Sequence, residues 1–374
     1  MVATGVMPTV SDLELAMDRI APTRYAASWD NVGLLVGDRA AEVTRVLVCI
    51  DLTPAVWAEA LRVGASAIVA YHPPIFDAKK RFLSGDFAFE AARVGIALYA
   101  PHTAWDAARG GANEVLADAL GLGERRPLRA MPEPGDTHHK LVTFVPEAAV
   151  DAVAHALAEA GAGRIGDYTH CTFRTHGEGT FLGGESTSPV VGVRGVLERA
   201  DEVRLEVVCP VERTRAVVDA LFASHPYETP AYDLVRLAPA REKGQHHPGL
   251  GLVGELAPTA IDALIARVKE ALGLSHVLVA GPTEGTVTRA AVGAGATGSL
   301  LADVRRAKAT FFLLGEMRHH DALEAARHGI TVVATLHSNS ERASLVPMAK
   351  ALREALSACE ISIAETCRDP FSFA

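Results

Sequence analysis

Short apolar runs alternate with amphipathic stretches in the first and last thirds of the chain. The runs predict strands at 46–50, 66–70, 95–100, 288–292, 310–314 and 330–335. Helical spacing of the apolar positions appears between them, most clearly at 54–63 and 320–328. Strands that are apolar on both faces are typical of a parallel sheet covered by helices on both sides. The two thirds resemble each other and predict an α/β class.

The middle third repeats a smaller unit. Each copy has a strand, a helix and a second strand, at 141–145, 147–160 and 164–168, then at 203–209, 212–223 and 231–237. A proline closes the first strand of both copies. Two β-α-β units of this size predict a ferredoxin-like α+β sandwich. Such a fold by itself implies no activity.

Two segments rich in proline and charge, 123–137 and 238–251, are typical of linkers or crossover loops. They divide the chain into a first core half at 1–135, an inserted domain at 136–240 and a second core half at 241–374. The predicted fold is therefore an α/β core of two similar halves with parallel-rich sheets, interrupted by an α+β insertion.

Composition narrows the classes of function. The chain has 374 residues, of which 49% are hydrophobic and 22% charged, which excludes collagen-like and disordered proteins. A net charge of −9 argues against a nucleic-acid partner or an anionic membrane surface. No apolar run approaches the ~20 residues of a membrane span, and the five cysteines include no C-x-x-C pair. We therefore expect a cytoplasmic protein that enters no membrane.

Histidine is unusually frequent, with 15 His against seven Lys. Three predicted strands each end one or two residues before a histidine: His72, His102 and His337. The C-terminal edge of a parallel sheet is where open α/β folds bind ligands. A carboxylate follows two of these histidines four positions on, at Asp106 and Glu341. This donor set suits Zn²⁺, Mn²⁺ or Fe²⁺, although loop histidines bonded to nearby backbone would give the same spacing.

A glycine-rich segment offers another interpretation. Residues 293–298, GAGATG, match G-x-G-x-x-G between an apolar run and a helical stretch, and Glu316 lies 18 residues past the last glycine. A dinucleotide-binding fold places its ribose-binding acid near that distance, so a nicotinamide enzyme is one alternative. A tight turn for close helix–sheet packing is a second. We favour a third, a backbone anion cradle beside the metal site.

The motifs at these positions resemble the Nif3-like dinuclear metal-centre family, also described as GTP cyclohydrolase 1 type 2 homologues. In the core they are SWDNVGL at 28–34, YHPPIF at 71–76, HTAWD at 102–106, GEMRHHDA at 315–322 and HSNSE at 337–341. In the insertion they are YTHCTFR at 168–174, GEGTF at 177–181 and HPYE at 225–228, which resemble the longer members. The resemblance covers nearly the whole chain in order.

The resemblance implies two divalent metal ions at the strand ends. Its metal-ligand positions fall on His72, Asp106, His337 and Glu341, with Glu341 as the bridge. Many members have a His-His pair where this chain has Tyr71 and His72, and a phenol is a poor ligand unless ionised. Tyr71 and His102 are therefore additional candidates. The resemblance also implies a PII/CutA-like insertion and a ring-shaped homohexamer.

The leading functional hypothesis is a metal-dependent hydrolase, in which a divalent pair activates water for attack on a planar carbon. If the family name holds, the substrate is GTP, and attack at the purine C8 opens the ring and releases formate. His320 or His102 would act as general acid or base. A small anionic substrate would meet arginines or the loop at 293–299. The PII-like insertion favours an alternative, a non-catalytic metal-binding or regulatory protein.

Overall fold

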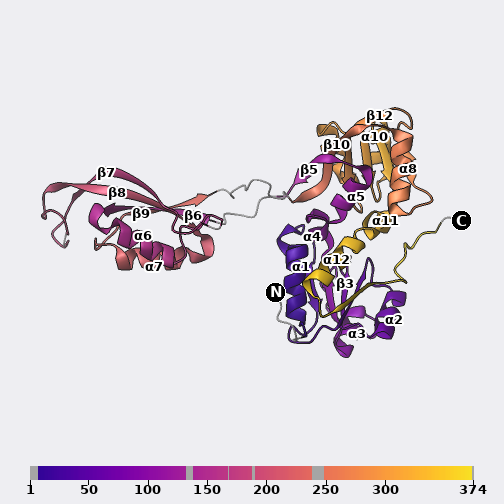
Figure 1. Cartoon of the computed structure of the whole chain (residues 1–374), viewed down its shortest axis with the longest axis horizontal. Helices are drawn as coiled ribbons and strands as arrows, with labels where there is room; N and C mark the ends of the chain where they lie inside the picture. Colours follow the sequence, from indigo (N-terminus) through magenta and orange to yellow (C-terminus); the bar gives the residue numbers. More distant parts are fainter. Residues whose placement is uncertain (1–6, 132–137, 167, 188–189, 238–247, 373–374) are drawn as a thin grey trace. The chain divides into compact units, whose positions relative to one another are not determined.

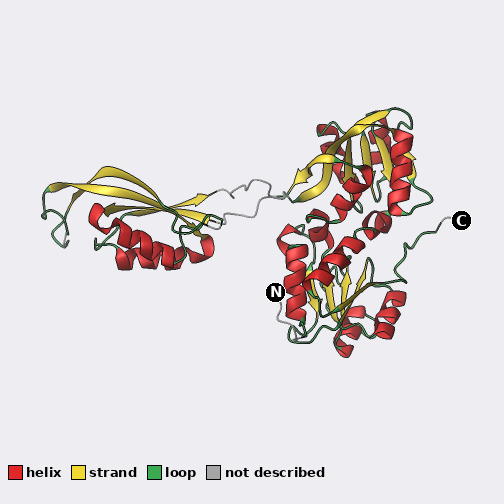
Figure 2. Ribbon diagram, in the orientation of Figure 1, coloured by secondary structure: helices red, strands yellow, loops and turns green. Residues whose placement is uncertain are grey.

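The computed structural model describes residues 7–131, 138–166, 168–187, 190–237 and 248–372. The chain is a mixed α/β protein with several sheets (Figure 2). It divides into two compact units (Figure 1). The larger unit joins Met1–Met131 with His246–Ala374, and the smaller unit is the segment Pro132–Gln245 between them.

The first sheet of the larger unit has five strands in the order β1-β4-β3-β2-β15. These strands are β1 (Gly33–Val36), β2 (Arg45–Cys49), β3 (Ala67–Ala70), β4 (Ala97–Ala100) and β15 (Glu360–Ile363). All neighbours are parallel except β1, which pairs antiparallel with β4. Helices α2 (Pro54–Val63) and α3 (Phe87–Val94) connect β2, β3 and β4. The side chains of β3 and β4 are buried on both faces, which explains their continuous apolar sequence.

The second sheet has six strands in the order β11-β14-β13-β12-β10-β5. These strands are β5 (Gly123–Ala130), β10 (Gly249–Ala260), β11 (Leu278–Ala280), β12 (Thr286–Gly293), β13 (Phe311–Leu314) and β14 (Thr331–Ala334). Strands β12, β13 and β14 are parallel, and helices α9 (Leu301–Arg306) and α10 (His319–Arg327) connect them. The succession of β12, α9, β13, α10 and β14 repeats that of the first sheet, as the sequence predicts.

Six other α-helices lie in the described part of the larger unit. They are α1 (Val10–Ile20), α4 (His102–Ala107), α5 (Ala112–Leu120), α8 (Ile261–Leu272), α11 (His337–Arg342) and α12 (Leu345–Ala355). Thr9 and Asp12 form a reciprocal capping box at the start of α1. One apolar core runs through both sheets, with members such as Ile68 in β3 and Phe311 in β13. This shared core fixes the two sheets against each other.

The smaller unit has the chain order β-α-β-β-α-β. Its elements are β6 (His138–Pro146), α6 (Val150–Glu159), β7 (Phe173–Leu182), β8 (Leu197–Pro210), α7 (Thr214–Ser224) and β9 (Tyr232–Leu237). The sheet order is β7-β8-β6-β9, and every neighbouring pair is antiparallel. Both helices cover the same face of the sheet (Figure 2). The core between them includes Leu141, Val153, Leu205 and Leu221.

Three details of the connections differ from the sequence prediction. Within 123–137, residues 123–130 form the edge strand β5 rather than a loop, and Pro127 fits there because an edge strand can lack one donor. Of the predicted loop 238–251, residues 238–247 lie outside the described residues. The end of this segment belongs to strand β10, Gly249–Ala260. The strand expected near 164–168 is β7 instead, since Ile165 and Tyr168 form only an isolated bridge. Throughout the described ranges, no helix is long and apolar enough to cross a membrane.

Candidate metal centre

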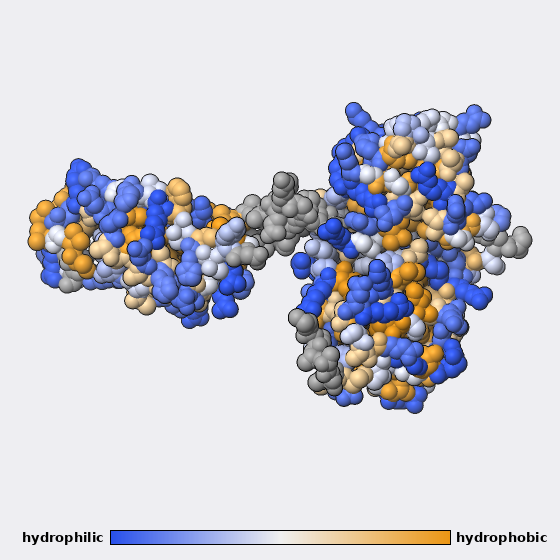
Figure 3. All heavy atoms as spheres, in the orientation of Figure 1, coloured by the Kyte–Doolittle hydropathy of each residue, from blue (hydrophilic) through white to orange (hydrophobic). Residues whose placement is uncertain are grey.

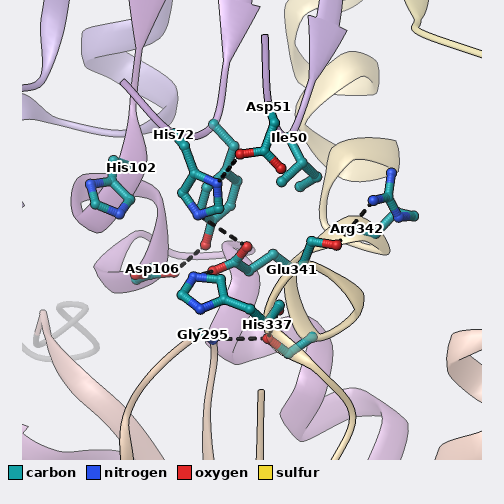
Figure 4. A network of polar contacts seen from close by, with 12 residues as sticks. Ile50, Asp51, His72, His102, Asp106, Gly295, His337, Glu341 and Arg342 are labelled. Atoms are coloured by element: carbon teal, nitrogen blue, oxygen red, sulfur yellow. Dashed lines mark hydrogen bonds and ion pairs between the residues drawn. The ribbon is translucent and has the colours of Figure 1, made fainter. Parts of the chain in front are cut away.

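Six parallel strands end beside one cluster of side chains. The residues that follow these strand ends by two or three positions are Asp51, His72, His102, Gly295, Glu316 and His337. Three of them come from the first sheet and three from the second. Because both sheets direct the carboxyl ends of their parallel strands here, the two halves of the larger unit build the site together (Figure 4).

His72, His337 and Glu341 form the centre of the cluster. One ligand atom from each lies within 4.8 Å of the others. The Glu341 Oε2 atom is 3.3 Å from His72 Nε2, and its Oε1 atom is 3.3 Å from His337 Nε2. The side chains point toward one another in Figure 4, and Glu341 is 2% exposed. Each oxygen of the Glu341 carboxylate therefore faces a different imidazole.

The donor atoms at this centre fit a divalent cation. His72 Nε2 and Glu341 Oε2 are buried, and neither has a hydrogen-bond partner in the described part of the chain. Buried polar atoms are ordinarily hydrogen-bonded, and a cation between them would satisfy both. Two imidazoles with a carboxylate and no thiolate also suit Zn²⁺, Mn²⁺ or Fe²⁺. The residues present therefore fit the group that the sequence implies.

A carboxylate holds the far side of each imidazole. The Nδ1 atom of His72 lies 2.8 Å from Asp51, and that of His102 lies 2.7 Å from Asp30. The Nδ1 atom of His337 lies 2.9 Å from Glu316. Such partners fix the ring orientations, and those of His72 and His337 leave Nε2 facing Glu341. Asp51 was not predicted from the sequence, although it follows β2 as His72 follows β3. That equivalence of position was the available signal.

Asp106 lies beside this centre, in contact with Tyr71. The Tyr71 hydroxyl donates a hydrogen bond to Asp106 Oδ1. Burial, and then the charge of Asp106, raise the pKa of the Tyr71 phenol, which favours a neutral donor over a phenolate ligand. Burial and the charge of Glu341 raise the pKa of Asp106 to about 7. The ring of His102 lies 5.3 Å from that of His72.

Two short helices bring the predicted pairs into place. Helix α4 begins at His102 and α11 at His337, so Asp106 and Glu341 follow one turn later on the same helix face. The first residue of α4, His102, has a positive φ angle of +28°. Leu336, the residue before α11, has a φ angle of +71°. Such angles cost energy for residues other than glycine and are frequent at functional sites.

The glycine-rich segment packs against the metal centre. Gly295 has φ +64°, and a Cβ there would lie 2.7 Å from Glu341 Oε1 and 3.3 Å from His337 Nε2. Its N–H donates to Ser340 Oγ, and the N–H of Ala294 donates to Asn113 Oδ1. These two amides are therefore used inside the protein. The favoured anion cradle is wrong for them, and close packing accounts for the glycine.

His320 lies apart from these contacts. It is exposed in the first turn of α10, and its ring lies 5.4 Å from that of His319. Among the described residues it makes no hydrogen bond, ion pair or ring contact with the cluster. Its catalytic role stays a prediction. Glu316, which the dinucleotide alternative used as a ribose-binding acid, instead contacts His337.

Without a cation, the cluster favours positive charge on its imidazoles. Burial alone would lower the pKa of His72, but the hydrogen bond to Asp51 and the nearby negative charge of Glu341 raise it to about 10. The hydrogen bond to Glu341 raises the pKa of His337 to about 9, against a smaller effect of burial. In return, the two imidazoles lower the pKa of Glu341 despite its burial. The carboxylates of the centre thus stabilise positive charge on the two imidazoles.

We predict that cation binding at this centre releases about two protons at pH 7, because ligation requires the neutral imidazoles of His72 and His337. The apparent affinity for Mn²⁺ or Co²⁺ should then rise by up to about 100-fold per pH unit until the pKa of about 9 is reached. Calorimetric titration in buffers of different ionisation enthalpy measures the proton count. Release of less than one proton would contradict this prediction.

The same pKa shifts fix the sign of a stability change in the cation-free protein. Folding raises the pKa values of His72 and His337. The two histidines therefore contribute fully to the free energy of unfolding below pH 6.5, the ordinary histidine pKa, and this contribution is lost as the pH rises through about 9 to 10. Bound cation should reverse this trend, since its affinity grows over the same pH range.

The fold and site define a mixed α/β protein with a histidine–carboxylate centre between two similar halves. The model of the Duf34/NIF3 (NGG1p interacting factor 3) family matches residues 8–370. The chain belongs to this family, which confirms the resemblance seen in its motifs.

Individual relatives agree with this assignment. The chain is 33% identical to the "GTP cyclohydrolase 1 type 2 homolog" of Halalkalibacterium halodurans, over 95% of this chain and 96% of that protein. The crystal structure of a Bacillus cereus protein related to NIF3 is 32% identical with a TM-score of 0.74, and the match covers 99% of this chain and 100% of the other. Staphylococcus aureus protein SA1388 is 26% identical with a TM-score of 0.83 over the same shares.

Proposed function

We propose that this protein is a divalent-metal-dependent hydrolase of the GTP cyclohydrolase 1 type 2 kind, acting on a nucleotide or related anionic substrate. Two ions, of Zn, Mn or Fe, would be held by the predicted ligands, which are His72, Asp106, His337 and Glu341. The observation that carries the proposal is the pair of buried atoms without hydrogen bonds, His72 Nε2 and Glu341 Oε2, 3.3 Å apart beside His337.

The chain's own residues prepare the site for water attack. A divalent cation supplies a Lewis acid there, which lowers the pKa of water towards 7. Asp51 and Glu316 hold the imidazoles of His72 and His337 in the orientation that faces the centre. Asp30 accepts from His102 Nδ1, which leaves His102 Nε2 as the ring atom that can exchange a proton with substrate.

An exposed aromatic pair supports a planar substrate. Trp29 is 63% exposed and Phe76 50% exposed, and their ring centroids are 6.0 Å apart. Both rings lie edge-on to His102, at 6.0 Å and 6.5 Å. Adjacent exposed apolar side chains rimmed by polar groups are one mark of a ligand-binding surface. A purine ring could stack on this pair while His102 contacts its edge.

The decisive experiment loads the full chain with Zn²⁺, Mn²⁺ or Fe²⁺ in turn and measures formate released from GTP. We expect release with at least one of the three ions and none in the Glu341→Gln variant, which keeps the side-chain volume but removes the charge. Absence of formate with every ion would overturn the cyclohydrolase proposal. The metal-binding alternative would then stand, provided that the ions bind.

We predict that Trp29→Ala raises the KM for GTP by about 10-fold with little change in kcat, since base stacking contributes about 1–3 kcal/mol. Trp29→Phe should retain most of the affinity because it keeps an aromatic face. Phe89→Ala, on α3 and 36% exposed, is the matched control and should leave KM unchanged. A KM for Trp29→Ala equal to that of the control would exclude the stacking role.

The alternative function is a non-catalytic, metal-binding regulatory protein. The smaller unit supports it, because its β-α-β-β-α-β order and antiparallel sheet are compatible with the predicted ferredoxin-like sandwich. We propose that this unit is the PII/CutA-like insertion that the sequence resemblance implies. Tight cation binding without turnover of any nucleotide would favour this alternative over the hydrolase.

We further propose that the chain assembles as a cytoplasmic homohexamer. Apolar side chains gather at the tip of the β7–β8 hairpin, where Leu182, Val190, Val193 and Leu197 are each at least 60% exposed (Figure 3). Exposed apolar patches of this kind are typical of protein interfaces. All five cysteines are free, in agreement with a reducing compartment.

Light scattering after size-exclusion chromatography tests the assembly. We predict a mass of about 236 kDa, corresponding to six chains of 39.4 kDa. Changing Leu182 and Leu197 to serine should shift the mass towards a smaller species, because both side chains lie on the exposed tip. A monomer in the unmodified protein would contradict the prediction.

A further inference from the structure

A second cluster of metal-ligating side chains lies on the smaller unit. One ligand atom each of His155, Glu159 and His170 lies within 4.8 Å of the others. The rings of His155 and His170 are stacked, with centroids 5.9 Å apart and an angle of 19° between their planes. All three side chains are exposed. None of them belongs to the metal centre of the larger unit.

The backbone fixes the position of this cluster. His155 and Glu159 are one turn apart on α6, so they lie on the same helix face. The chain after α6 turns through Gly163, whose N–H donates to Val208 O and whose carbonyl accepts from the N–H of Cys171. This last hydrogen bond holds the segment of His170 beside the end of α6.

Two residues at this turn have left-handed backbone angles. Gly163 has φ +69°, and a Cβ there would lie 2.9 Å from Cys171 O, so only glycine permits this approach. His170 has φ +59°, an angle that asparagine tolerates but most side chains avoid. The imidazole of His170 is thus held over α6 by backbone contacts rather than by a side-chain partner within the helix.

The ligand atoms of this cluster are available. Across the described residues, no hydrogen bond or ion pair engages the His155 imidazole or the Glu159 carboxylate, and His170 Nδ1 contacts only Thr169 Oγ1, at 3.2 Å. A hollow of about 510 Å³ lies next to the cluster, and its lining includes Glu159, Thr169 and His170 together with Arg164, Glu212 and Arg213. It leaves room for an ion and the water that completes its coordination.

We propose that His155, Glu159 and His170 bind a divalent transition-metal ion, most favourably Zn²⁺, at a site separate from the metal centre. Two imidazoles and one carboxylate supply three of the four ligands of a tetrahedral Zn²⁺ site, and the fourth position is open to solvent or an exogenous ligand. The exposed side chains can close the distances between their ligand atoms by rotamer changes, without moving α6. The site ties the last turn of α6 to the segment that leads into β7.

Zn²⁺ stoichiometry in the full chain tests this site. Equilibrium dialysis should show about one equivalent fewer for His155→Ala and for His170→Asn than for the unmodified protein. Asparagine is chosen at 170 because it keeps the positive φ angle while removing the imidazole. His176→Ala is the matched control, since His176 is an exposed histidine of the same unit and pairs only with exposed Glu147 in the described chain. It should retain every equivalent.

A second readout isolates the site from the metal centre. In the Glu341→Gln background, Co²⁺ should still give the visible absorption of a low-symmetry histidine-ligated ion, and adding His155→Ala should abolish it. Circular dichroism verifies that each variant is folded. Unchanged Zn²⁺ stoichiometry in both single variants, or an equal loss in His176→Ala, would overturn the proposal.

Discussion

Replacing Glu341 by glutamine is expected to reduce the metal content of the larger unit from about two equivalents per chain to near zero. The substitution keeps the volume and removes the charge that faces both His72 Nε2 and His337 Nε2 at 3.3 Å. A neutral amide cannot bridge two cations as a carboxylate does. Elemental analysis of protein purified without chelators measures the change in metal content. Making the measurement in the His155→Ala background removes the metal bound at the smaller unit from the count.

Two further variants sharpen this prediction. His337→Ala should lose metal to a similar extent because it removes a ligand on the other side of Glu341. His328→Ala is the control, since His328 follows α10, is exposed and lies 4.0 Å from Glu324 rather than at the centre. Unchanged content in the Glu341 and His337 variants would refute the proposed ligand set.

Gly295→Ala should weaken metal binding by about 10- to 100-fold, an effect typical of changes around ligands. The added methyl group would lie 2.7 Å from Glu341 Oε1, so the carboxylate must leave its position between the imidazoles. The left-handed backbone at φ +64° adds a cost of about 1–2 kcal/mol, and overpacking adds about 1–3 kcal/mol. Calorimetric titration with Mn²⁺ and thermal unfolding measure the two effects.

Gly273→Ala separates backbone strain from contact with the site. Gly273 ends α8 with φ +65°, nearly the same angle, and a Cβ there meets nothing within 4 Å. This control should lower the stability by the backbone cost alone and leave metal affinity unchanged. Equal affinities for Gly295→Ala and Gly273→Ala would show that the glycine loop does not support the metal centre.

Sequence patterns predicted strands β2, β3 and β4 of the first half and β12, β13 and β14 of the second half well, because each is a short apolar run with helices on either side. The pairs His102/Asp106 and His337/Glu341 were also readable, since a spacing of four puts two residues on one helix face. The prediction was wrong at β5. Its charged residues and proline are typical of a loop, but the segment pairs with β10 and forms an edge strand. It also gave no sign that β15, at the end of the chain, joins the first sheet beside β2.

Short-range patterns are sufficient for the local features of the chain: which runs become strands, where histidines follow them, and which carboxylates lie one turn later. These depend on neighbours only a few residues apart. The tertiary structure alone decided that Glu341 faces His72 as well as His337, that Asp51 supports His72, and that a glycine must lie against the carboxylate. Those contacts join residues from two sheets, and they depend on how a shared apolar core aligns the sheets.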